Sequence, residues 1–152
     1  AKGDYDTALR YLEQSLAIRQ QIGDRQGEGA TLNNISQIYD AKGDYDTALR
    51  YLEQSLAIMQ QIGDISGLAA TLNNMGAIYL NQKNDVEQAI GAFMGSYRIF
   101  QQIGSPNVQY PANYLGAIIE RIGEAKFKEV IAKENNFSNM ALESQSSKKQ
   151  LP

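Results

Sequence analysis

The 152-residue sequence contains no histidine and no cysteine. Without imidazole or thiolate groups, the chain cannot build the usual zinc or haem sites, disulfides, cysteine nucleophiles or Ser-His-Asp triads. Basic residues are not in excess, and the net charge of −3 gives no positive field to attract nucleic acid or an anionic membrane. No apolar run reaches the roughly 20 residues of a membrane-spanning helix, and the start does not resemble a signal peptide.

Residues 1–40 and 41–80 are two copies of one unit. They differ only at positions 19, 25, 26, 28, 29, 35, 36, 37 and 40 of the first copy. A third, diverged copy follows, since SYRIFQQIG at 96–104 matches SLAIMQQIG at 55–63. We expect an array of about three and a half repeats at 1–40, 41–80, 81–120 and 121–134. A polar tail or linker of weak order is expected at 135–152, where the composition is rich in Ser, Asn, Gln and Lys. Because the chain begins inside a repeat, we expect it to be a fragment of a longer one.

Each copy is predicted to form two helices, because its apolar residues recur three and four positions apart. In the second copy this pattern runs from Tyr45 to Ile62 and again from Leu68 to Tyr79. Gly63-Asp64 stands between the two patterns, and the same Gly-Asp pair stands at 43–44. Gly can end a helix in the left-handed conformation and Asp can cap the next one. Such helix pairs cannot cover their own apolar faces, so the predicted fold is all-α, a solenoid of stacked antiparallel helix pairs.

One set of residues spans the junction of the first two copies: Leu32, Ile35, Ser36, Tyr39, Gly43, Asp44, Tyr45, Ala48, Leu52 and Ser55. This set resembles the signature of the tetratricopeptide repeat (TPR) family. The period of forty is similar to the long repeats of kinesin light chains and LGN-type adaptors, and the T-L-N-N string at 31–34 and 71–74 resembles kinesin light chain repeats in particular. The resemblance implies a right-handed solenoid and a cytoplasmic protein–protein interaction scaffold. It implies no enzyme activity and no cofactor.

In the TPR family the first helix of each pair lines a concave groove that holds a partner peptide. Carried onto this chain, the resemblance implies that Asn34 and Asn74 bond the ligand backbone, since an amide offers both a donor and an acceptor. The predicted peptide-binding residues are Asn33, Asn34, Gln37, Asn73, Asn74, Asn81, Asn113, Tyr114 and Arg121. The alternative is that Asn33 and Asn34 are only polar residues of a solvated helix face.

In the third copy Tyr114 stands where Asn34 and Asn74 stand. Tyr110, Tyr114 and Arg121 could close the groove with an aromatic surface and a cation for an acidic group. The alternative is that the two tyrosines pack at the end of the array. This packing interpretation fits better, because end repeats are usually atypical caps.

Asp44 and Asp46 lie at a predicted helix start, where carboxylates complement the helix dipole, so we interpret them as structural rather than as acid–base or metal-binding groups. An alternative function is self-assembly through exposed stacking faces. The stripe expected to lack one neighbour lies within residues 5–22 and includes Tyr5, Ala8, Leu9, Leu12 and Leu16. In the tail, Phe137, Met140 and Leu142 form an apolar cluster that could dock in a groove.

Overall fold

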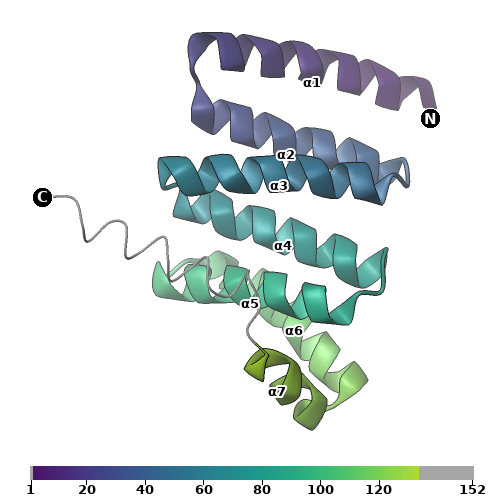
Figure 1. Ribbon diagram of the computed structural model, residues 1–152, viewed down its shortest axis with the longest axis vertical. Coiled ribbons are helices and arrows are strands. Elements are labelled where there is room, and N and C mark those ends of the chain that lie inside the picture. The colour runs from purple at the N-terminus through teal and green to yellow at the C-terminus, as the bar shows by residue number, and fades with distance from the viewer. Residues whose placement is uncertain (1, 134–152) are drawn as a thin grey trace, which may run out of the picture. The chain divides into compact units, whose positions relative to one another are not determined.

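The computed structural model describes residues 2–133, and within them every regular element is helical (Figure 1). The elements are α1 (Lys2–Ile22), α2 (Arg25–Ala41), α3 (Tyr45–Ile62), α4 (Ile65–Asn81), α5 (Val86–Gln102), the short 3-10 helix η1 (Pro106–Val108), α6 (Gln109–Ile122) and α7 (Glu124–Ala132). The all-helical prediction is therefore confirmed for this part of the chain. None of the described helices is long and apolar enough to cross a membrane. The predicted tail, with Phe137, Met140 and Leu142, lies outside the described residues.

The turns before α3 and α4 use the predicted Gly-Asp pair. Gly43 and Gly63 have φ values of +82° and +72°, a conformation that only glycine adopts at low cost. Asp44 and Asp64 each accept a hydrogen bond from the backbone N–H three residues later, at 3.2 and 2.8 Å. Because the glycine ends one helix and the aspartate caps the next, consecutive helices are joined by almost no loop.

The chain divides into two compact units, Ala1–Thr71 (unit 1) and Leu72–Pro152 (unit 2), and the division falls within α4. In unit 1, α2 packs against both α1 and α3. Its core includes Leu32 and Ile35 of α2, together with Ala48 and Leu52 of α3, and all four side chains are buried. Residues with the three-and-four spacing seen in the sequence thus meet at one interface.

Unit 2 has its own core, formed where α5 meets α6 and α7. Phe93 of α5 is completely buried there, beside Leu115 and Ile118 of α6 and Phe127 of α7. Gly76 of α4 lies under the Phe93 ring, and a Cβ added to it would be 2.7 Å from a ring carbon. This glycine replaces Ser36 of the first copy because the aromatic ring needs the space.

Candidate functional site

The neighbouring amides Asn33 and Asn34 of α2 have different environments. The Asn33 Nδ2 donates to Ser55 Oγ of α3 at 2.8 Å and to Thr71 Oγ1 of α4 at 2.9 Å. Ser55 Oγ in turn donates to the Gly29 carbonyl of α2 at 2.9 Å. We call these four groups the Asn33 junction. It lies within unit 1 and links three helices through buried or half-buried polar groups.

Asn34 lies on the exposed side of α2, together with Ala30 one turn before it and Gln37 one turn after it. Within the described part of the chain, the side chains of Asn34 and Gln37 make no hydrogen bond. We call Ala30, Asn34 and Gln37 the Asn34 face. Its two amides leave both donors and acceptors open to a ligand.

Asp40 stands in the last turn of α2, where the helix dipole disfavours a negative charge. Its Oδ1 is buried and has no hydrogen-bond partner within residues 2–133. Burial raises the pKa of this carboxyl above its ordinary value. The second copy has Leu80 at this position, so Asp40 is not required by the fold of the repeat.

In unit 2 the amides of α4 are placed differently from those of α2. Asn74 is half-buried and Asn81 is exposed. Asn73 corresponds to Asn33, and Ser96 corresponds to Ser55. Among the described residues, however, neither Asn73 Oδ1 nor Ser96 Oγ has a hydrogen-bond partner, although both atoms are buried. The residue types of the Asn33 junction therefore recur without all of its bonds.

The third helix predicted to carry site residues is α6. Asn113 is exposed, whereas Tyr114 is half-buried and stacks on Phe93 with ring centroids 4.5 Å apart. Arg121 donates from Nη2 to Asn84 Oδ1 at 2.6 Å, which holds the turn before α5. Tyr110 is exposed. Tyr114 and Arg121 thus contact other residues of unit 2, whereas the Tyr110 side chain is exposed.

The α1 stripe that we expected to lack one neighbour is less buried than its counterpart on α3, since Leu12 and Leu16 are half-buried whereas Leu52 and Leu56 are buried. Leu9 is buried, and Tyr5, Leu12 and Leu16 are half-buried on the side of α1 that packs against α2. The exposed large apolar residues of α1 are Tyr11, Ile18 and Ile22. At 100° per residue these three share a different side of the helix, and the sequence spacing alone could have identified it.

The described residues contain no cluster of three or more acidic side chains that could hold a metal ion. The aspartates Asp24, Asp44, Asp64 and Asp85 instead cap helices. The backbone N–H of Gly27 lowers the pKa of Asp24, with a further contribution from Arg19 and a partly opposing effect of burial. These carboxylates act in the turns, as we interpreted Asp44 from the sequence.

One comparison with known proteins agrees with the paired helices. Residues 1–61 match the family model described as tetratricopeptide repeat. No curated protein is significantly similar to the chain. Residues 1–61 therefore resemble tetratricopeptide repeats, and the paired helices of the described chain are consistent with a helical solenoid of that kind.

Proposed function

We propose that the chain is an interaction scaffold that binds a peptide of a partner protein through amides on α2, α4 and α6. These are the first helices of the pairs when each pair is counted from the Gly-Asp turn before α2. Tetratricopeptide repeats are generally protein–protein interaction modules. The finer part of the proposal is that the ligand is an extended or helical peptide held by amide side chains. The location proposed for this binding is the cytoplasm, by analogy with the adaptors whose long repeats this chain resembles.

The observation that carries the proposal is the contrast between Asn33 and Asn34. The N–H donors of Asn33 are used inside unit 1, whereas Asn34 is exposed and makes no side-chain hydrogen bond within residues 2–133. Asparagine is a mediocre helix former, so an exposed asparagine in the middle of a helix does not stabilise that helix. An amide can hydrogen-bond both the N–H and the C=O of an extended peptide, so peptide binding would explain an asparagine at position 34.

The other predicted residues divide in the same way. We assign ligand contact to Asn34 and Gln37 of α2, and to Asn74, Asn81 and Asn113 at the later repeats. Asn33, Tyr114 and Arg121 are proposed to fix the helices that carry these amides. Asn73 is assigned to neither group, because its buried Oδ1 has no hydrogen-bond partner among residues 2–133. Since the amides address the peptide backbone, specificity would come from the side chains around them.

The test is a quantitative pull-down from source lysate with the immobilised chain. Asn34→Ala/Asn74→Ala is expected to lose the bound partner, with circular dichroism and solution mass unchanged. Gln54→Ala is the matched control, because Gln54 is an exposed amide on α3. It should retain the partner in full. A partner retained equally by the double variant would contradict the role of the amides and leave the scaffold function intact.

A second candidate function is self-assembly through an exposed stacking face. The exposed Tyr11, Ile18 and Ile22 on α1 favour it, since contiguous apolar surface promotes association. A mass that rises with protein concentration, and falls back in an Ile18→Glu variant, would support this function over the first.

A further inference from the structure

Asp40 lies at the border between the packed side and the open side of α2. It follows Asn33 by about two helical turns, so it lies on the side of α2 that packs against Ser55 of α3. It also follows the exposed Gln37 by one turn, which puts it beside the Asn34 face. Asp40 is half-buried, and its Oδ1 is inside the protein. The other oxygen, Oδ2, is therefore the one that a ligand on the Asn34 face could reach.

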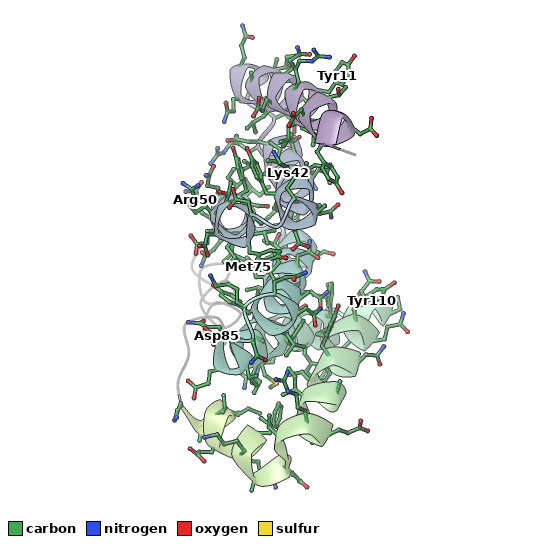
Figure 2. All side chains as sticks on the ribbon, turned by 90° about the vertical axis from the view of Figure 1, so that its right-hand side faces the viewer. Tyr11, Lys42, Arg50, Met75, Asp85 and Tyr110 are labelled. Atoms are coloured by element: carbon green, nitrogen blue, oxygen red, sulfur yellow. The ribbon has the colours of Figure 1, made fainter. Side chains whose placement is uncertain are left out.

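No positive group of the described chain compensates the charge of Asp40. Within residues 2–133 its carboxyl makes neither an ion pair nor a hydrogen bond. Lys42, labelled in Figure 2, is the nearest basic residue in the sequence, but it pairs with Asp6 of α1 at 3.6 Å and lies over the Tyr39 ring. Burial raises the pKa of Asp40, and the last turn of α2 contains no basic residue. Because the helix dipole also disfavours a carboxylate at this end, the Asp40 charge destabilises the free chain.

We propose, on the basis of the proposed function, that Oδ2 of Asp40 binds the ammonium group of a lysine side chain in the partner peptide. The described residues contain no acidic cluster for a metal ion, and a single carboxylate is too few ligands for one, so the expected cation is organic. An arginine fork takes both oxygens of a carboxylate, whereas the lysine ammonium is a point charge that needs only one. Since Oδ1 is buried, lysine fits Asp40 better than arginine does.

A lysine bound at Asp40 would be stabilised by two features of α2. Burial has already removed part of the water around the carboxylate, so its attraction for a cation is stronger than that of a fully exposed carboxylate. The negative end of the helix dipole lies in the same turn and attracts the cation as well. Gln37 and Asn34, one and two turns earlier, can bond the backbone of the same peptide. The corresponding residues of the other copies are Leu80, which has no charge, and Glu120, which is exposed, so the lysine subsite belongs to α2.

The test is a phage selection of short random peptides on the immobilised full chain. Peptides selected by the unmodified chain should share a lysine at one position, and Asp40→Asn and Asp40→Leu should select peptides without it. Glu53→Gln is the matched control, because Glu53 is an exposed carboxylate on α3, and it should select the same lysine.

The selection also separates this proposal from the proposed function. If the unmodified chain selects no peptide that Asn34→Ala/Asn74→Ala fails to select, the proposed function itself is contradicted. Peptides that depend on the amides but share no lysine, or a lysine that Asp40→Leu selects equally, would overturn the lysine subsite alone.

A selected peptide then gives a readout that a purely structural role of Asp40 would not produce. Its affinity, measured by fluorescence anisotropy, should fall roughly tenfold for Asp40→Asn, whereas a peptide with the lysine replaced by glutamine should bind both chains within about twofold. Asp40→Leu should lose lysine binding in the same way and yet raise the midpoint of thermal unfolding, because it replaces an uncompensated charge with the residue of the second copy. Equal losses for the two peptides, or a midpoint that falls in Asp40→Leu, would mean that Asp40 supports the fold and would overturn the proposal.

Discussion

At the scale of single residues, identical side chains make different hydrogen bonds in the two units. Asn33 and Ser55 are bonded to each other in unit 1. Their counterparts in unit 2 include buried oxygens, Asn73 Oδ1 and Ser96 Oγ, that have no partner among residues 2–133. A buried polar atom stabilises a fold only when its hydrogen bonds are made. The same residue types should therefore raise the free energy of unfolding in unit 1 and lower it in unit 2.

This contrast leads to a matched pair of substitutions. Ser55→Ala should lower the free energy of unfolding by about 1–3 kcal/mol, because it removes the acceptor for Asn33 Nδ2 and the donor to the Gly29 carbonyl. Ser96→Ala removes a hydroxyl that makes no bond within the described chain, and should change the free energy by less than about 0.5 kcal/mol or raise it. Urea unfolding of both variants measures the difference. Equal losses in the two variants would contradict the assignment of the bonds.

At the scale of helices and turns, the sequence carried most of the information. The Gly-Asp pairs at 43–44 and 63–64 predicted both helix ends, because each residue type has one strongly preferred role there. The turn into α6 was not predicted. It passes through η1, where Ser105 caps a 3-10 helix that begins at Pro106, and no other copy has this pair. The turns of the first two copies could be predicted by comparing the copies with each other, but the third copy has diverged too far for that comparison.

The cap of α2 makes a pH-dependent prediction. Asp24 has a lowered pKa in the folded chain, so its negative charge stabilises the fold above its ordinary value of 3.8, and this contribution is lost as the pH falls through the lowered pKa. Asn is an equally good cap without the charge. Asp24→Asn should therefore be less stable than the unmodified chain at pH 7, and the difference should disappear in strong acid.

Thermal unfolding at a series of pH values measures this effect. Asp64→Asn is the control, because the residue five positions before Asp64 is Met59, whereas Arg19 stands five positions before Asp24 and pairs with it at 2.5 Å. The loss at pH 7 should be smaller for Asp64→Asn than for Asp24→Asn. Equal losses would mean that Arg19 contributes nothing to the cap.

At the scale of the whole chain, the repeat predicted the architecture better than it predicted the surfaces. The helical period showed which residues lie inside, but it did not distinguish the two neighbouring amides of α2. Only the positions of Ser55 and Thr71 showed that Asn33 is used within unit 1. The exposed Tyr11 and Ile18 of α1 were not named from the sequence for a related reason, since identical residues are more buried in the second copy. The likeness to kinesin light chain repeats stays a prediction, because the family match extends over residues 1–61 and is to tetratricopeptide repeats in general.

Stacked repeats contact mainly their neighbours, so damage to one repeat should remain local. Ala48 is completely buried where α3 packs in unit 1, and Ala48→Leu should overpack this site at a cost of about 1–3 kcal/mol. Ala57→Leu is the control, because Ala57 is exposed on the same helix, and it should change stability by less than about 0.5 kcal/mol. Hydrogen exchange read by mass spectrometry should show protection lost first in α2 and α3 of the Ala48 variant, while the core of unit 2 around Phe93 keeps most of its protection. An equal loss in all helices would mean that the two units unfold as one cooperative body. In that case a partner bound at any one repeat would stabilise the entire chain, whereas local unfolding would let each repeat respond to its own ligand.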